Sequence, residues 1–482
     1  MEVLLSAVAS DLVGRLVSFL VNKYQDPGAA DDIARLQRAL LRASAIVEEA
    51  EGRQIANRAM LQQLNRLRGQ MCRGSYVLDA FMRRAATASR SLLPPGSDGA
   101  DGLAVVESLE AALSDMREFI VLLGSCPRVN RQPYSAYLFM ESCMFGRQLE
   151  KEQIIGFLLQ PAHDLGVLPV IGPHDVGKRT LVEHVCLDER VRQHFTKIHR
   201  LTGDDLEQSL SNDHEHHGSS MDATERSLIV IDLAGGGGDA DEEEETWRRF
   251  RSSVRRRAHG ESKIVLISRA ERHAGLGTAP PLRLRAPRRE ELWYLFKALA
   301  FGGADPEERP ELVRIAVALF ASIPAGIAPF AVANKAAASL RADLSARSWR
   351  RVLKVSAGAT ELELGGALPG WRDRPEEKTG YYYPSMPVKD APSAPCLFYN
   401  RRKVTGMARS ELPKVTVLEL LDGGAAPPGG EKRFDVLVWQ SRIPPYASYV
   451  ATCDMERAQQ VVTGKKRLNK RGQRQDEHTS SK

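Results

Sequence analysis

The chain has 482 residues, of which 43% are apolar and 27% are charged, which is typical of a soluble globular protein with about three domains. The net charge of +6 is too small on a chain of this length to indicate nucleic-acid binding by itself. The six cysteines are scattered and none forms a Cys-x-x-Cys pair, so we expect reduced thiols of the cytosol or nucleus rather than a disulfide framework or a zinc knuckle.

The first 125 residues read as helices. Residues 1–20 are apolar at helical spacing, but charged residues interrupt them, so they predict an amphipathic packing helix and not a signal peptide or a membrane span. Ala30–Glu51, Met60–Met82 and Ala104–Leu123 repeat the pattern. Residues 1–125 are therefore predicted to form an up-and-down bundle of four helices.

After a proline-containing linker at residues 126–140, the pattern changes from helical spacing to short apolar runs. Leu165–Ile171, Ser227–Leu233 and Lys263–Ser268 are three such runs. Buried parallel strands look like this, because helices cover both faces of their sheet. Residues 141–285 are therefore predicted to be a parallel α/β domain.

The remaining chain divides by composition. Residues 286–356 return to helical periodicity, and residues 357–455 are rich in proline and glycine. Within the latter, Lys414–Leu420, Phe434–Trp439 and Tyr446–Val450 are predicted strands. We therefore expect a helical subdomain followed by a small β-containing module.

Residues 456–482 are polar and basic, and they predict a disordered tail. The run Lys465–Arg471 suits either a nuclear import signal or a solubilising tail. The expected location is cytoplasmic, with the nucleus as an alternative reached through this run.

The segment Gly172–Thr180 (GPHDVGKRT) follows a predicted strand and precedes a predicted helix, which is the context of a P-loop. In a P-loop, backbone N–H groups of the turn and the helix N-terminus converge on phosphate oxygens. Gly177 would let the backbone approach a phosphate, and Lys178 would reach the outer phosphates. The segment therefore predicts a nucleotide pocket.

One position of this loop departs from the P-loop pattern. The residue after the lysine should be Ser or Thr, whose hydroxyl binds magnesium, but here it is Arg179. A guanidinium cannot bind a cation, although it can pair with phosphate directly. Thr180 offers a hydroxyl one residue later. Two interpretations stay open: a pocket that binds phosphate, and a loop kept only as scaffold.

The second predicted strand ends at Asp232, the place where a P-loop protein has the acid that holds the water shell of magnesium. Leu233 stands where a second acid often activates water. Sustained hydrolysis is therefore not expected, and any activity would be that of a weak NTPase. Arg269 follows the third strand and is either a sensor of the terminal phosphate or a solvated side chain.

Two further clusters favour plain interpretations. His214–His217 contains three histidines in a polar loop, but adjacent histidines rarely converge on one metal ion. Arg248–Arg257 is rich in arginine without interleaved aromatic residues, which favours a solvated helix face over a nucleic-acid patch. Neither a Ser/His/Asp nor a Cys/His arrangement can be read from the chain.

Taken in order, these motifs resemble the NB-ARC nucleotide switch of plant disease-resistance proteins of the coiled-coil NLR class. The resemblance covers about residues 1–356, including two bundle segments, Ala45–Asn57 and Tyr76–Phe81. The leucine-rich repeats and the winged-helix subdomain of the family are not recognisable. The other matching segments are Phe145–Arg147, Gly172–Leu181, Ile229–Asp232, Ser262–Arg269, Trp293–Phe301 and Gly326–Pro329.

The resemblance implies ADP or ATP as the ligand, with an ARC1-like helical subdomain at residues 286–356. It makes Asp232 the single candidate residue for magnesium, held through its water shell. It implies partner proteins, NLR-type receptors or a second copy, bound through the N-terminal bundle. The implied nucleotide-binding residues are Arg147, Gly172, Gly177, Lys178, Arg179, Thr180, Asp232, Arg269 and Pro329.

The function expected from the resemblance is that of a nucleotide-binding defence-signalling protein with weak or no hydrolysis, acting as an adaptor, helper or decoy. The alternative is an interaction scaffold whose P-loop fold is a relic. Neither interpretation involves a membrane span or nucleic acid.

Overall fold

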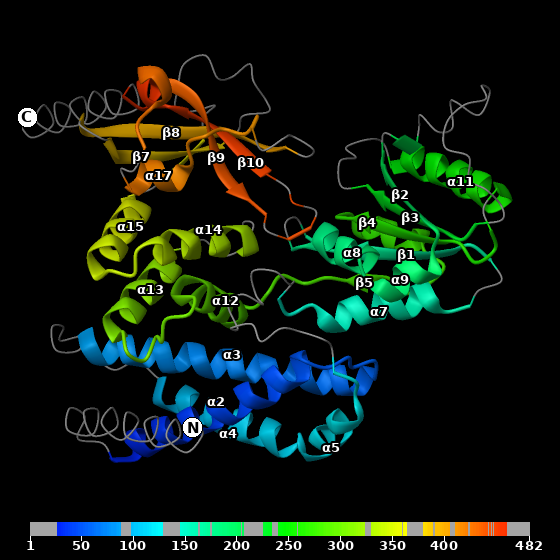
Figure 1. Ribbon diagram of the computed structural model, residues 1–482, viewed down its shortest axis with the longest axis horizontal. Coiled ribbons are helices and arrows are strands. Elements are labelled where there is room, and N and C mark those ends of the chain that lie inside the picture. Colours follow the sequence, from blue (N-terminus) through cyan, green and yellow to red (C-terminus); the bar gives the residue numbers. More distant parts are fainter. Residues whose placement is uncertain are drawn as a thin grey trace, which may run out of the picture. The chain divides into compact units, whose positions relative to one another are not determined.

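Figure 1 shows the computed structural model of the chain, with labelled helices and strands. The expected helix within residues 1–20, the cluster His214–His217 and residues 460–482 of the tail lie outside the described residues. The described residues are 27–87, 98–128, 145–161, 164–173, 176–203, 205–206, 225–233, 240–257, 259–322, 329–358, 360–363, 379–388, 391–404, 410–422, 425–441, 443–444, 446 and 448–459.

The chain divides into two compact units. One comprises residues 1–295 and 325–330, and the other comprises residues 296–324 and 331–482. The first contains the N-terminal helices and a parallel sheet, and the second contains further helices and an antiparallel sheet.

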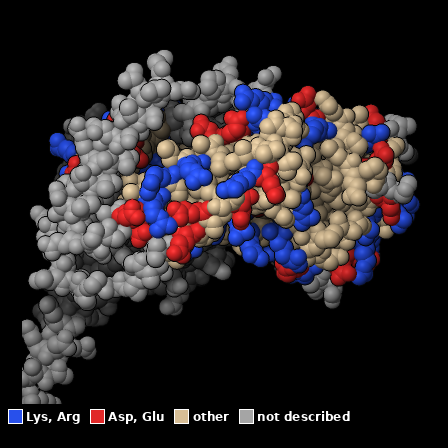
Figure 2. Space-filling model, turned by 90° about the horizontal axis from the view of Figure 1, so that it is seen from below, with Lys and Arg blue, Asp and Glu red and all other residues tan. Residues whose placement is uncertain are grey.

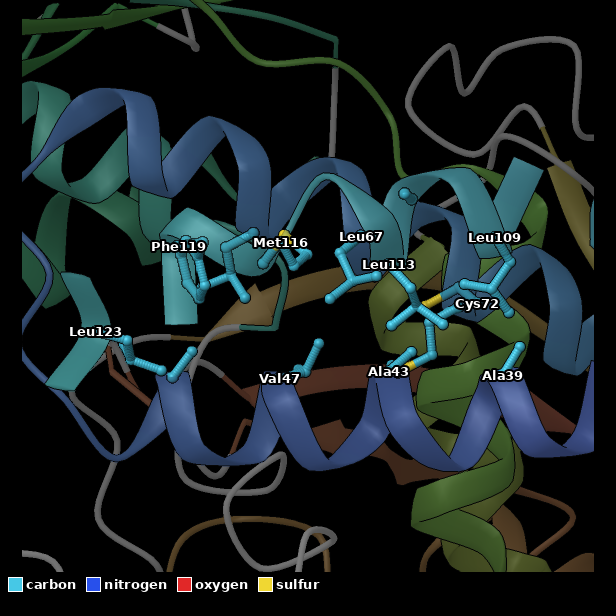
Figure 3. Close-up of a cluster of buried hydrophobic side chains, with 14 of the residues drawn as sticks. Ala39, Ala43, Val47, Leu67, Cys72, Leu109, Leu113, Met116, Phe119 and Leu123 are labelled. Carbon is cyan, nitrogen blue, oxygen red and sulfur yellow. The ribbon is translucent and has the colours of Figure 1, made fainter. Parts of the chain in front are cut away.

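Four described helices make up the N-terminal part of the first unit: α2 (Pro27–Glu51), α3 (Arg58–Thr87), α4 (Asp98–Ser114) and α5 (Arg117–Ser125). Small residues recur along the inner stripe of α2, which lets the neighbouring helices approach closely. Figure 3 shows the α2 side chains directed toward those of α3, α4 and α5. The core residues labelled there are Ala39, Ala43, Val47, Leu67, Cys72, Leu109, Leu113, Met116, Phe119 and Leu123.

The single helix expected at residues 104–123 is two helices. The α4 helix ends at Ser114, where the N–H of Met116 donates to the carbonyl of Leu113 and tightens the backbone into a turn. Met116 is itself buried, and the change in direction lets Phe119 and Leu123 of α5 enter the same core. Burial of these side chains outweighs the continuous helical periodicity of the sequence.

Two segments that carry the family resemblance meet within the first unit. Trp293 lies in α12 (Arg289–Phe301), and its indole N–H donates to the carboxylate of Asp79 on α3 at 2.9 Å. The ring of Tyr76 packs edge-on against the same indole. Both Asp79 and Trp293 are buried, so the hydrogen bond satisfies polar groups that would otherwise be costly to bury.

The parallel sheet of the first unit has the strand order β2-β3-β4-β1-β5. Its strands are β1 (Gly166–Ile171), β2 (Lys197–Thr202), β3 (Ser227–Asp232), β4 (Lys263–Ser268) and β5 (Leu282–Arg283). The three runs predicted as buried parallel strands form β1, β3 and β4, and these predictions are confirmed. The sequence analysis did not find β2 and β5.

Helices cover both faces of this sheet, as expected for apolar strands that are buried throughout (Figure 1). The helices α7 (Gln148–Leu159), α8 (Lys178–Cys186) and α9 (Glu189–His194) pack on one face. The helix α11 (Ala240–Arg257) packs on the other through Trp247 and neighbouring apolar residues. Alternate residues of each strand therefore belong to two separate cores.

The glycine run and the acidic run that follows it, residues 235–245, lack apolar side chains to bury and predict a loop, but the acidic run lies within α11 and is helical. Glu244 and Glu245 lie in α11 and form ion pairs with Arg248 and Arg249 one turn later. Acidic side chains in the first turns followed by basic ones stabilise a helix. Residues 234–239, which contain the glycine run, lie outside the described part of the chain.

The helical part of the second unit contains α13 (Pro310–Ser322) and α15 (Ala346–Gly358), and α14 (Pro329–Ala342) enters it after its first residues. Trp349 of α15 is fully buried, and its indole N–H donates to the carbonyls of Leu340 and Asp343. These helices agree with the helical periodicity of residues 286–356.

The β-rich residues of the second unit form an antiparallel sheet in the order β6-β7-β8-β10-β9. The predicted strands at 434–439 and 446–450 correspond to β9 and β10, whereas β6, β7 and β8 were not predicted. The strand bounds are β6 (Thr360–Glu363), β7 (Thr379–Val388), β8 (Ala391–Val404), β9 (Arg433–Gln440) and β10 (Ser448–Asp454).

The predicted strand Lys414–Leu420 is wrong, because this segment enters a helix, α17 (Val417–Asp422). Thr416 and Glu419 form a reciprocal capping box: the backbone N–H of Thr416 donates to the Glu419 carboxylate, and the N–H of Glu419 donates to the Thr416 hydroxyl. The Thr-x-x-Glu spacing predicts the start of a helix. The strand prediction was based on the β-branched residues of the segment instead.

The expectation of reduced thiols is wrong for one pair of cysteines. Cys396 of β8 and Cys453 of β10 form a disulfide within the core of the antiparallel sheet. The strand register sets Cys453 opposite Phe398, so Cys396 lies two residues away on the same face. Cys72, Cys126 and Cys186 are free thiols, and burial raises the pKa of Cys72 and of Cys186 to about 12.

The surface carries charges of both signs. On the face drawn in Figure 2, Lys and Arg alternate with Asp and Glu, and neither sign forms a continuous field. Among the described helices, none combines the length and the apolar character needed to cross a membrane.

Candidate functional site

The site predicted from the sequence lies at the carboxyl edge of the parallel sheet. The strand register aligns Ile171 at the end of β1 with Ser268 at the end of β4 and with Arg283 at the end of β5. On the other side of β4, Asp232 ends β3 beside Ile267. Ligands of open parallel sheets bind in the crevice outside the carboxyl ends of the strands.

Two glycines are required by the backbone of the loop after β1. The N–H of Gly172 donates to the carbonyl of Ser268, and a Cβ at Gly172 would lie 2.5 Å from the carbonyl oxygen of Leu284. Gly177 precedes α8 and has φ of 90°, a left-handed conformation that other residues rarely adopt. Residues 174 and 175 of this loop lie outside the described chain.

Lys178 is the first residue of α8 and is only 7% exposed. Its ammonium group donates hydrogen bonds to the carbonyl of Gly172 at 2.7 Å and of Pro173 at 2.6 Å. The side chain therefore curls back over the loop and holds a positive charge at the N-terminus of the helix. Thr180 lies half-buried in the same first turn.

Arg179, the residue that departs from the P-loop pattern, reaches across the end of β4. Its Nε–H donates to Oδ2 of Asp232, and the two side chains form an ion pair. Arg179 is 45% exposed and Asp232 is 16% exposed, so the pair lies at the border between the protein and solvent. The structure thus joins two of the residues that the sequence analysis named separately.

The residues at this point do not fit a magnesium ion. Magnesium takes oxygen ligands in a near-octahedral arrangement, and a guanidinium supplies only N–H donors. The carboxylate that would hold the water shell of the metal already contacts the cationic side chain of Arg179. The loop glycines and Lys178, in contrast, fit the phosphate groups of a nucleotide.

A polar network behind the loop was missed by the sequence analysis. The hydroxyl of Ser268 lies 2.7 Å from Nδ1 of His273 and accepts the N–H of Ala270 at 3.0 Å. Nε2 of His273 lies 3.2 Å from the Glu243 carboxylate of α11. The Nε–H of Arg272 also donates to Nε2 of His273 at 3.3 Å, so the ring has polar neighbours at both nitrogens. Glu243 is 30 residues from His273, so a local sequence pattern cannot predict this network.

The His273 network predicts that the first unit becomes less stable in mild acid. Burial lowers the pKa of His273 below its usual value, and the contact with Glu243 opposes this shift. The unfolded chain therefore binds more protons than the folded chain between that lowered pKa and about pH 6.5, so the free energy of unfolding decreases as the pH falls through this range.

Thermal unfolding of the full chain at about pH 7.5 and about pH 5.5 measures this effect. Substitution His273→Gln is expected to reduce the loss of stability in acid, while His259→Gln, in the loop before β4, serves as the control. Burial also lowers the pKa of His184, His194 and His199, so the variant keeps part of the dependence. An unchanged pH dependence in His273→Gln would contradict the assignment.

Arg147 lies at the start of α7, on the same side of the sheet as the loop. It is buried, and its guanidinium donates to the Glu150 carboxylate and to the carbonyl of Arg285, which closely follows β5. These contacts tie the segment leading into the domain to the edge strand of the sheet.

The remaining predicted site residues are Arg269 and Pro329. Arg269 follows β4 and is exposed. Pro329 is the first residue of α14, a position that suits proline because the missing N–H has no helical partner there. The three residues before Pro329 in the expected base-contacting motif lie outside the described chain.

Two comparisons of sequence identify relatives of the chain. Residues 8–101 match the family described as Rx N-terminal domain. The disease resistance protein RGA2 of Solanum bulbocastanum is 25% identical over 342 residues, which cover 65% of this chain and 34% of that protein. The putative disease resistance protein RGA1 of the same species is 24% identical over 341 residues, with the same coverage.

The chain spans about a third of the length of the curated relatives it matches. Among solved structures, part of the chain matches PCH-2 of C. elegans with a TM-score of 0.29 and 9% identity over 45% of this chain and 71% of that chain. Domain III of the Thermotoga maritima replication initiation protein DnaA has a TM-score of 0.24 and 13% identity over 47% of this chain and 90% of that chain.

The family match and the curated relatives support the resemblance to plant disease-resistance proteins of the NLR type. The chain is therefore similar to plant disease-resistance proteins over about two thirds of its length, and its residues 8–101 match the Rx N-terminal domain.

Proposed function

We propose that this chain binds the phosphates of a nucleotide, ADP or ATP, on the loop from Gly172 to Thr180. The observation that carries the proposal is the buried ammonium group of Lys178 at the N-terminus of α8, beside two glycines that the loop backbone requires. A fixed positive charge and a helix N-terminus together attract an anion.

Each site residue has a proposed role. Lys178 and the first turn of α8 hold the outer phosphates, and Arg179 supplies a second positive charge. Arg269 senses the terminal phosphate from the end of β4. Arg147 and Pro329 lie on segments that resemble those contacting the nucleobase in the NB-ARC family.

We do not propose nucleotide hydrolysis, because Leu233 follows Asp232 at the position where a general base would activate water.

The proposed cellular role is defence signalling. It rests on the similarity to disease resistance proteins and on the match of residues 8–101 to the Rx N-terminal domain. The helices α2–α5 of the N-terminal part offer a surface to other proteins. The proposed partners are NLR-type receptors or a second copy of the chain, with this protein acting as an adaptor, helper or decoy.

A second candidate, an interaction scaffold with a relic loop, is favoured by one specific observation. The ammonium group of Lys178 is held by the carbonyls of its own loop, and Arg179 is held by Asp232. A loop closed in this way is stable without a ligand. Under this candidate, the N-terminal helices and the antiparallel sheet carry the function.

Titration of the full chain with fluorescent ADP separates the two candidates. Unlabelled ADP and ATP are expected to displace the probe, and adenosine is expected to compete at least about tenfold less well. A hydrogen bond to a charged group is worth about 1.5–3 kcal/mol, and 1.4 kcal/mol corresponds to a factor of about ten in affinity. Absence of binding, or equal competition by adenosine, would favour the scaffold.

A further inference from the structure

The ion pair between Arg179 and Asp232 occupies the place where a P-loop protein holds magnesium. In such proteins the hydroxyl after the lysine binds the metal, and the acid at the end of the second strand holds its water shell. Here the residues at these two positions contact each other directly. The protein thus carries a cation of its own at that point.

The geometry leaves the guanidinium able to meet a ligand. Its contact with Asp232 is made through Nε–H, and the two terminal nitrogens carry the other four donors of the fork. The side chain is 45% exposed and projects from α8, the helix whose first residue is Lys178. A planar guanidinium with adjacent donors matches phosphate oxygens better than a point charge does.

We propose that Arg179 is a permanent substitute for magnesium, so that the site binds the polyphosphate of a nucleotide without any divalent cation. Asp232 orients the guanidinium through Nε, and the terminal nitrogens donate to phosphate oxygens. The inference rests on the proposed function and deepens it, because it defines the ligand as a metal-free nucleotide.

The charge balance at the site supports the same conclusion. Arg179 and Lys178 are two cationic side chains among the described residues of the loop, and Asp232 is the acid that pairs with Arg179. A divalent cation brought to this point would meet the guanidinium at short range and be repelled. Metal binding would therefore require the ion pair to separate first.

The substitution Arg179→Thr tests the inference, because it restores the hydroxyl and releases Asp232. Fluorescent ADP is titrated into each full-length protein with magnesium and with EDTA. The unchanged protein is expected to differ by less than about twofold between the two conditions, and Arg179→Thr is expected to bind at least about tenfold more weakly in EDTA. Manganese, followed by its electron paramagnetic resonance signal with ADP present, reports metal binding directly.

Arg200→Thr is the matched control. Arg200 lies on β2, and its guanidinium pairs with the Glu183 carboxylate of α8 at 2.8 Å. This variant therefore removes an exposed ion pair between an arginine and an acid of α8, away from the loop. It is expected to behave like the unchanged protein in both conditions.

Asp232→Asn is a second variant, which keeps Arg179 and is expected to bind ADP in EDTA even if Arg179→Thr does not fold.

The outcomes separate the two proposals. A requirement for magnesium in the unchanged protein would overturn the inference and leave nucleotide binding intact. Binding by Arg179→Thr with magnesium, but none by the unchanged protein, would overturn both proposals, because Arg179 would then prevent nucleotide binding. Absence of nucleotide and manganese binding in all variants would overturn both.

Discussion

Replacing Leu109 by alanine is expected to cost the N-terminal helices about 2–5 kcal/mol of unfolding free energy. Leu109 lies in α4 and is 0% exposed, within the core shared by α2, α3 and α4 (Figure 3). Removing its branched end leaves a cavity that rigid neighbouring helices fill only in part. Hydrogen exchange of peptides from residues 27–125 measures the free energy of opening for these helices alone, which suits a chain of several domains.

The matched control is Leu41→Ala on the adjacent helix α2. Leu41 is 72% exposed, so the same chemical change removes little buried surface and is expected to cost less than about 0.5 kcal/mol. Equal protection factors in the two variants would show that the described core does not hold these helices together. Nucleotide binding at Lys178 should survive Leu41→Ala unchanged.

The strands that could be predicted from sequence are the ones that the fold buries on both faces. The apolar runs that became β1, β3 and β4 are covered by helices on each side, so they are apolar at nearly every position. The strand β2 lies at the edge of the sheet with partly exposed side chains, and β5 has two residues. Neither leaves an apolar run long enough to recognise.

Errors elsewhere came from weighing composition above local chemistry. The segment before Asp422 is rich in β-branched residues, yet the capping box between Thr416 and Glu419 starts a helix there. The acidic run at the start of α11 lacks apolar residues, yet its ion pairs with arginines one turn later support a helix. In both cases, interacting side chains three or four residues apart in the sequence indicated the helix.

The components of the candidate site could be named from sequence, but their contacts could not. Arg179 and Asp232 are 53 residues apart, and they meet only because β4 lies between β1 and β3 and aligns the strand ends. The disulfide of Cys396 with Cys453 depends in the same way on the register of β8 and β10. Long-range contacts of this kind follow from strand order, which local patterns do not contain.

Replacing Lys178 by alanine is expected to weaken nucleotide binding about 10- to 150-fold, which corresponds to the loss of about 1.5–3 kcal/mol for one hydrogen bond to a charged group. The ammonium group is buried at the N-terminus of α8, so solvent water cannot take over its hydrogen bonds to a phosphate. Fluorescent ADP binding to the full chain gives the change in affinity. Lys178→Met, which keeps the apolar stem, shows whether the effect comes from the charge or from the packing of the loop.

Lys197→Ala is the control for this prediction, because it removes a lysine charge from the same sheet at the opposite edge. Lys197 begins β2 and pairs with Glu225, whereas the phosphate loop follows the carboxyl end of β1. The control is expected to bind ADP as the unchanged protein does. If the unchanged protein binds nucleotide and Lys178→Ala abolishes both binding and defence signalling, the loop is a working switch. If Lys178→Ala signals normally, the loop serves only as scaffold, and the N-terminal helices become the place to look for function.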